Sequence, residues 1–194
     1  VVQKLGSYVG EILGTMPHDV VGLLVGDWLR ARRMENASRI FEKTKSILED
    51  RGIDPADEQC VSPRLGVPYL ESASLESDDE LQDVWARLMA NAMDPNTNIT
   101  LRQEYIETLR EFEPIDALVL SAAAQLGPTN THVLDISDLL ETVNKVAWDH
   151  LAVSLANLHK LSCVETVGSN SRIEDRARTT PLGRELIRAV SQRP

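Results

Sequence analysis

Apolar residues recur at helical spacing along most of the chain, so the sequence predicts a mainly α-helical protein. A short helix is expected over residues 1–16, ending at Pro17. A long helix is expected from about Asp19, its cap, to Arg51, with Gly52 closing it. The predicted apolar stripe of this long helix is Val21, Leu24, Trp28, Ala37, Phe41, Thr44 and Leu48.

Residues 53–64 carry two prolines and few apolar side chains, which is typical of a loop, and a weaker helix is expected over residues 65–74. The clearest helix start is Ser77-Asp78-Asp79-Glu80, where we expect Ser77 to cap the helix and Glu80 to reach back to it. That helix is expected to end near Asp94-Pro95, and another follows over residues 100–112. The predicted buried positions of these two helices are Leu81, Val84, Trp85, Leu88 and Met89, then Leu101, Tyr105, Leu109 and Phe112.

From residue 113 the pattern predicts helices over residues 114–125, 135–144 and 146–161, of which the second is capped by Asp135. In the third helix Trp148, Leu151, Leu155 and Leu158 align. Two strands, residues 162–167 and 173–179, precede a closing helix opened by Thr180-Pro181. We therefore expect an all-α fold class: a helical bundle (residues 1–112) followed by a winged-helix-like C-terminal region (residues 113–194) with one small β-hairpin.

Composition and charge narrow the function classes. The net charge of −10 argues against a general nucleic-acid binder, because neutralising phosphates needs a basic face. Cys60 and Cys163 lie far apart, without a nearby Cys or His at metal-ligand spacing, which favours a reduced compartment. No secretory signal opens the chain, so a cytoplasmic protein is expected, although its start on Val1 leaves an upstream segment open.

Candidate chemistry is weak throughout the sequence. Six acidic residues lie between Glu71 and Asp83 with no Lys or Arg among them, but acids also gather at helix N-termini because the helix dipole favours them there. His18, His132, His150 and His159 form no metal-binding pair. Motifs of hydrolases and nucleotide-binding loops do not occur. We therefore expect no enzymatic activity, no metal and no cofactor.

Two further patterns leave alternatives to a protein-interaction module. The predicted wing carries the basic cluster Arg172, Arg176 and Arg178, which would be the nucleic-acid contact of a winged-helix DNA-binding regulator. Near the N-terminus, Gly6, Gly10 and Gly14 form a small-residue ridge that Gly22 and Gly26 repeat, a spacing that recurs in membrane helix pairs. Acidic residues and Pro17 interrupt that span, so we favour tight packing in a bundle and keep membrane insertion on activation as the alternative.

A family resemblance is carried by residues 69–76 (Tyr-Leu-Glu-Ser-Ala-Ser-Leu-Glu) and residues 79–95 (Asp-Glu-Leu-Gln-Asp-Val-Trp-Ala-Arg-Leu-Met-Ala-Asn-Ala-Met-Asp-Pro). It continues through Tyr105-Ile106-Glu107, Leu109 and Pro114-Ile115-Asp116-Ala117. These stretches resemble the signature of the Abi-alpha family and cover mainly residues 60–120. Arg87 stands where family members usually have Asn, and a proline usual near Thr100 is absent.

The resemblance implies a bacterial setting, because Abi-alpha is a family of unknown molecular function associated with abortive infection, the defence in which an infected cell halts phage at its own expense. It implies no catalytic residues. The expected partner is a host or phage protein, and a homo-oligomer is left open. The signature or binding candidates are Glu71, Glu80, Asp83, Trp85, Asn91 and Asp94. Among them Asn91 stands out, because an amide near a helix end often bonds backbone or a partner.

Overall fold

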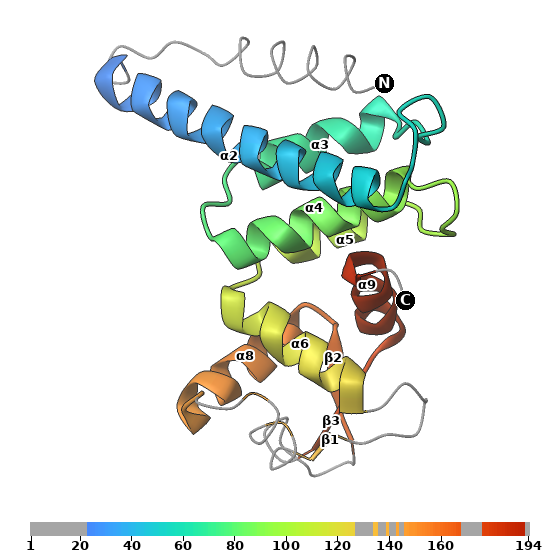
Figure 1. Cartoon of the computed structure of the whole chain (residues 1–194). Helices are drawn as coiled ribbons and strands as arrows, with labels where there is room; N and C mark the ends of the chain where they lie inside the picture. The colour runs from blue at the N-terminus through green and yellow to red at the C-terminus, as the bar shows by residue number, and fades with distance from the viewer. Residues whose placement is uncertain are drawn as a thin grey trace. The chain divides into compact units, whose positions relative to one another are not determined.

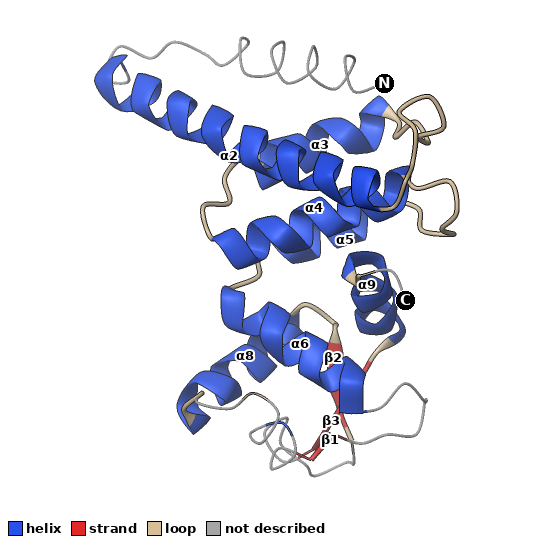
Figure 2. Cartoon of the chain, in the orientation of Figure 1, coloured by secondary structure: helices blue, strands red, loops and turns tan. Residues whose placement is uncertain are grey.

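The computed structural model of the protein describes residues 23–126, 134–135, 139, 143, 146–167 and 176–192 (Figures 1 and 2). The chain divides into two compact units, of which the first comprises residues 1–110 and 189–194 and the second residues 111–188. Both are mainly helical, which confirms the predicted fold class. The predicted helix over residues 1–16 and the glycines Gly6, Gly10, Gly14 and Gly22 lie outside the described residues.

The described part of the first unit contains the helices α2 (Leu23–Asp50), α3 (Pro63–Ala73), α4 (Asp79–Met93) and α5 (Gln103–Arg110). Helix α2 packs against both α3 and α4, and α3 also packs against α5. In none of these, nor in the other helices of the described ranges, is there a stretch long and apolar enough to cross a membrane.

Trp85 is the centre of the first unit's core, with 1% of its surface exposed. The ring of Tyr69 meets it edge-on, with centroids 5.3 Å apart and planes at 75°. The Tyr69 hydroxyl donates a hydrogen bond of 2.7 Å to the Trp85 carbonyl, so the buried phenol is satisfied. The stripe predicted for α4, from Leu81 to Met89, is buried as expected.

The apolar stripe predicted for α2 is buried or half-buried in the second half of the helix, whereas Val21 and the side chain of Leu24 lie outside the described residues. Ala37, Thr44 and Leu48 are buried, whereas Trp28 exposes 62% of its surface. No side chain described between residues 26 and 35 is buried. We call residues 26–35 the exposed end of α2 (Figure 1). Helical periodicity there does not reflect burial, so the prediction for Trp28 was wrong.

Helix ends follow the expected residue types with one correction. Gly52 closes α2 with a φ of 69°, in the left-handed region that favours glycine. The cap of α4 is Asp78 and not Ser77: its backbone is extended and its carboxylate accepts from the amides of Glu80 and Leu81, each at 3.0 Å. An ionised carboxylate at this position accepts two amide bonds and also complements the helix dipole, which a hydroxyl does not.

The second unit combines α6 (Pro114–Leu126), α8 (Trp148–Lys160) and a three-stranded antiparallel sheet. The predicted hairpin is present as β2 (Val164–Thr166) and β3 (Arg176–Thr179), with Glu165 opposite Arg178. A third strand, β1 (Leu134–Asp135), pairs with β3 and was not predicted. Asp135, expected to cap a helix, lies in this strand opposite Arg176.

The predicted helix over residues 135–144 falls mostly outside the described residues, apart from Leu139 and Val143, which are buried. A winged-helix-like arrangement therefore stays a prediction. The last helix, α9 (Pro181–Val190), is opened by Thr180 as expected, since the Thr180 hydroxyl accepts from the Gly183 amide at 3.0 Å.

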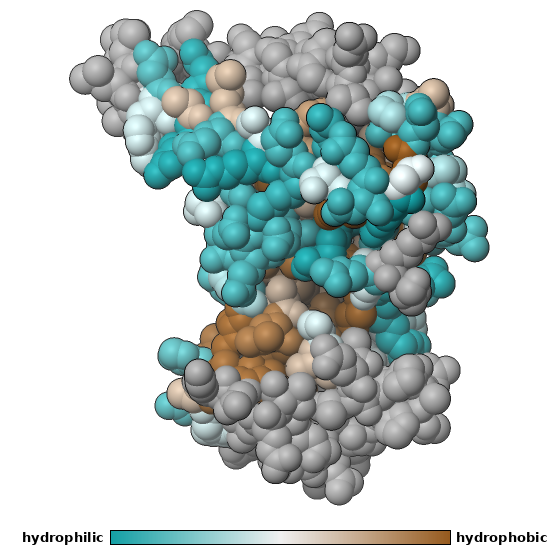
Figure 3. Space-filling view, viewed as in Figure 1, coloured by the Kyte–Doolittle hydropathy of each residue, from teal (hydrophilic) through white to brown (hydrophobic). Residues whose placement is uncertain are grey.

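The second unit is held together by the apolar face of α8 and by a buried carboxylate. Leu151, Leu155 and Leu158 are fully buried, whereas Trp148, predicted to align with them, is 45% exposed at the first residue of the helix. Asp116 of α6, 1% exposed, accepts from Ser154 at 2.6 Å and from Asn157 at 2.7 Å. On α6 itself, apolar side chains reach the surface, with Leu118 47% exposed (Figure 3).

Gly183 lies against main chain, and we predict that its replacement by alanine will be costly. A Cβ there would lie 2.1 Å from the Cys163 carbonyl oxygen, which already accepts from the Thr180 amide at 2.9 Å. Because this neighbour is backbone, Gly183→Ala should lower the free energy of unfolding by about 2 to 3 kcal/mol, measured by urea denaturation. In Gly66→Ala, the control, the nearest atom would be 3.9 Å away. Equal stability of the two variants would contradict the packing argument.

Candidate functional site

A polar hollow in the first unit contains one of the signature candidates, Asp83. It has a volume of about 450 Å³ and is bounded by α2, by α4 and by Gln192 from the C-terminal residues that belong to the same unit. Its charged lining comes from both helices. The residues lining it are Lys43, Ser46, Ile47, Asp50, Arg51, Asp83, Arg87 and Gln192.

One face of α4 binds the main chain of residues 189–191. Asp83, Arg87 and Asn91 are spaced four apart and so share a helix face. The Arg87 guanidinium donates to the Val190 carbonyl at 2.8 Å. The Asn91 amide donates to the carbonyls of Ala189 and Ser191 at 2.7 and 3.0 Å. Asn91 is 3% exposed, and both donor hydrogens of its side-chain amide therefore bond to backbone of the same unit.

Lys43 of α2 is held by two carboxylates of α4. Its ammonium lies 2.7 Å from Asp79 Oδ1 and 2.6 Å from Asp83 Oδ1. Burial lowers the pKa of Lys43, but the hydrogen bonds and charges of Asp79 and Asp83 outweigh that effect and raise it overall. Lys43 consequently stays protonated at neutral pH and is no candidate for a general base.

Asp94 forms a buried ion pair rather than a surface site. Its carboxylate is 0% exposed and lies 3.2 Å from the guanidinium of Arg51, which is 10% exposed. The other carboxylate oxygen accepts from the Asn96 amide at 2.8 Å, in the turn that ends α4. Asp94 thus fixes the end of α4 against the end of α2.

Asp83 is the one signature candidate among the residues that line this hollow. Trp85 is in the core, and Glu80 is exposed in the first turn of α4. Glu71 is exposed on α3, where its carbonyl, not its carboxylate, accepts from Arg33 at 3.3 Å. Within the described ranges no three His, Cys, Asp or Glu side chains gather as a metal site would require.

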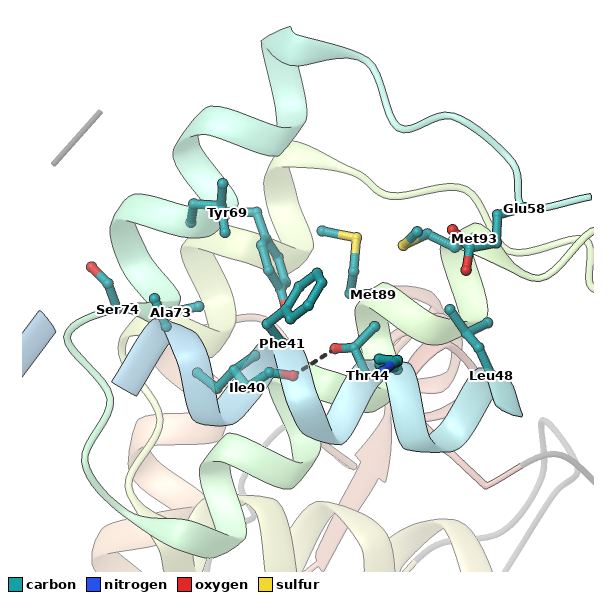
Figure 4. Close-up of a pocket in the computed structure, with 13 residues that line it drawn as sticks. Ile40, Phe41, Thr44, Leu48, Glu58, Tyr69, Ala73, Ser74, Met89 and Met93 are labelled. Carbon is teal, nitrogen blue, oxygen red and sulfur yellow. Dashed lines mark hydrogen bonds between the residues drawn. The ribbon is translucent and has the colours of Figure 1, made fainter. Parts of the chain in front are cut away.

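A second, apolar hollow lies between α2, α3 and α4 (Figure 4). It is narrow, with about 30 Å³ of free volume. Figure 4 shows Phe41, Tyr69 and Met89 at its middle, and Glu58, Leu48 and Met93 toward one end. We call this hollow the apolar crevice.

Glu58 is the unexpected member of the apolar crevice. It comes from the loop between α2 and α3, exposes 8% of its surface, and its Oε2 atom is buried without a hydrogen-bond partner. Burial, assisted by the charge of Asp54, raises the pKa of the Glu58 carboxyl. Sequence reasoning missed this residue, because an acid within a Pro-containing polar loop gives no sign of burial. Lys43 of α2 and Arg51, which directly follows that helix, were also missed. They lie eight residues apart, or about 80° around a helix of 3.6 residues per turn, so the sequence pattern relates them only weakly.

The basic cluster predicted for the wing is described only in part. Arg178 is paired with Glu165, with its Nε and Nη2 atoms 2.9 and 2.7 Å from the same carboxylate oxygen. Arg172 and the side chain of Arg176 lie outside the described residues. Asn157 on α8 is also engaged, with the Asp116 carboxylate. The positive charge of Arg178 is therefore neutralised by the neighbouring Glu165 carboxylate.

Comparison with known proteins gives one match. The family model described as "Abortive infection alpha" matches residues 35–190, well beyond residues 60–120, where the resemblance is read most directly from the sequence. No curated protein matches the chain, and no solved structure does either. The matched segment includes most of α2, both hollows except Gln192, and the residues of the second unit. Because it spans most of the sequence, the chain belongs to the abortive infection alpha family.

Proposed function

We propose that the protein acts in abortive infection by binding another protein, in the cytoplasm, through the exposed end of α2. Its family membership associates it with abortive infection. Free Cys60 and Cys163 fit a reducing compartment. The observation that carries the proposal is Trp28, which exposes 62% of its surface although Trp is among the most buried residue types on average.

The neighbourhood of Trp28 supports a protein contact. Leu29 and Met34 on the same helix end are 45% and 52% exposed. Charged residues surround them, with Arg30 near Asp27 at 3.6 Å and Arg32 near Glu35 at 3.0 Å. Apolar anchors of Trp and Met within a polar rim that contains Arg are typical of the centres of protein interfaces.

The engagement of the signature residues in internal contacts points the same way. Within the first unit, Asp83 pairs with a lysine, Asn91 donates to main-chain carbonyls, and Asp94 pairs with an arginine. Side chains that are bonded inside the unit hold the helices in position. Their internal bonds support a structural role for the signature. The binding surface is then expected outside the signature, on residues such as Trp28.

Replacing Trp28 by alanine tests the proposal. Surface substitutions usually change stability by about 0.5 kcal/mol or less, so Trp28→Ala should melt like the wild type. Loss of an interface anchor costs about 2 kcal/mol or more, which weakens partner binding roughly thirtyfold. We expect the variant to lose phage protection in plaque assays at unchanged protein level.

The control is Trp148→Ala, which removes the exposed Trp of the second unit and should retain protection. Full protection by a Trp28→Ala, Leu29→Ala double variant would exclude the exposed end of α2 as the contact. Loss of protection in Trp148→Ala alone would instead favour the second unit as the binding surface.

A further inference from the structure

We propose that the apolar crevice binds the ammonium end of an unbranched alkylamine, with Glu58 as its counter-ion. The ammonium belongs either to a free amine or to a lysine side chain of another protein, and the chemistry of recognition is the same. This site is separate from the exposed end of α2 and does not depend on the function proposed above.

The Glu58 carboxylate is held in place by the loop that carries it. The Ile53 amide donates to the Leu48 carbonyl at 3.0 Å, and Ile53 is itself buried. On the other side, the Gln59 amide donates to the Met93 carbonyl at 2.8 Å. The loop is thus hydrogen-bonded to α2 and to α4 on either side of Glu58. These bonds fix the backbone that places the Glu58 side chain in the crevice.

Glu58 has an unmet need for a hydrogen-bond donor. Its Oε2 atom is buried with no partner, and leaving a charged acceptor unsatisfied is costly. Lys45 also lines the crevice, but it is 47% exposed and its ammonium lies 3.6 Å from Glu49. A cation that donates N–H bonds from within the crevice would satisfy Glu58.

The rest of the crevice selects a slender apolar body. About 30 Å³ of free volume is room for roughly two water-sized groups and is far below the roughly 150 Å³ of a cavity that binds benzene, so a ring does not fit. Met89 and Met93 are unbranched and adapt their shape to fill or open such gaps. The rings of Phe41 and Tyr69 flank the middle of the crevice, where apolar methylene groups would contact them (Figure 4). A chain of methylenes that ends in an ammonium combines a thin apolar body with N–H donors for Glu58.

The test uses n-butylammonium as probe and 1-butanol as its uncharged analogue, titrated into the full chain by NMR or calorimetry. We expect saturable binding of the amine and much weaker binding of the alcohol. Glu58→Gln keeps the shape but removes the charge, and should weaken amine binding by about tenfold or more. Glu42→Gln removes an exposed acid of α2 that does not line the crevice, and it should leave amine binding unchanged.

Two capped peptides, one with lysine and one with norleucine at its centre, distinguish the sources. Tighter binding of the lysine peptide than of n-butylammonium identifies a protein side chain, and the reverse identifies a free amine. The proposal is overturned if neither amine saturates, if 1-butanol binds as well, or if folded Glu58→Gln binds like the wild type. An unchanged melting temperature of Glu58→Gln verifies that a loss of binding is not a loss of fold.

Discussion

Replacing Trp85 by alanine is expected to lower the free energy of unfolding by about 3 to 5 kcal/mol, one of the two largest effects that we predict. The side chain is 1% exposed, and its removal would leave a cavity beside Tyr69 as well as losing the transfer energy of the indole. Urea denaturation followed by circular dichroism would measure the change.

Trp148→Ala is the matched control for Trp85→Ala, because Trp148 is 45% exposed. It should change stability by about 0.5 kcal/mol or less. If both variants lost the same stability, the effect of Trp85→Ala would not come from the core. An unchanged melting temperature for Trp85→Ala would mean that Trp85 is not packed as described.

Asp94→Asn should also cost about 3 to 5 kcal/mol, because it leaves the charge of Arg51 buried without its partner. Asparagine keeps the shape and can still accept from the Asn96 amide, so the substitution isolates the charge. Denaturation at neutral pH would give the loss. By contrast, Glu49→Gln, which breaks the exposed pair with Lys45, should cost about 0.5 kcal/mol or less.

A double-mutant cycle separates the ion pair from other roles of Asp94. Arg51→Met removes the cation that Asp94→Asn leaves behind, so the double variant should regain most of the lost stability. Additive losses in the two single variants would show that the pair is not the source of the effect, and that Asp94 stabilises the end of α4 by other bonds.

The sequence predicts elements better than it predicts their burial. Apolar spacing located α2, α4, α5, α6, α8 and the hairpin, because tertiary packing follows helical and strand periods in those segments. Trp28 and Trp148 fit their stripes equally well, yet both are exposed. A period marks a helix face, but only the neighbouring elements decide how far along the helix that face is covered.

The sequence predicted which types of residue cap the helices, but not always which position does so. Ser77 and Asp78 are both good caps, and the choice between them depends on which residue has the extended backbone. The strand β1 spans two residues, too few for an alternating pattern.

The candidate site was only partly accessible from the sequence. The polar face of α4 follows from the spacing of Asp83, Arg87 and Asn91, but its partners come from α2 and from residues about a hundred positions away. Such long-range pairs leave no local pattern. Glu58 is the extreme case, because a polar loop predicts exposure and only the fold buries it.

The hydrogen bonds from α4 to residues 189–191 also set an order of events during translation. A ribosome adds roughly 5 to 20 residues per second. The second unit, residues 111–188, is therefore made over about 4 to 16 seconds before Ala189 leaves the ribosome's active site. Throughout that interval Arg87 and Asn91 lack the carbonyls that they bind in the finished fold. Completion of the first unit thus waits on synthesis of the second.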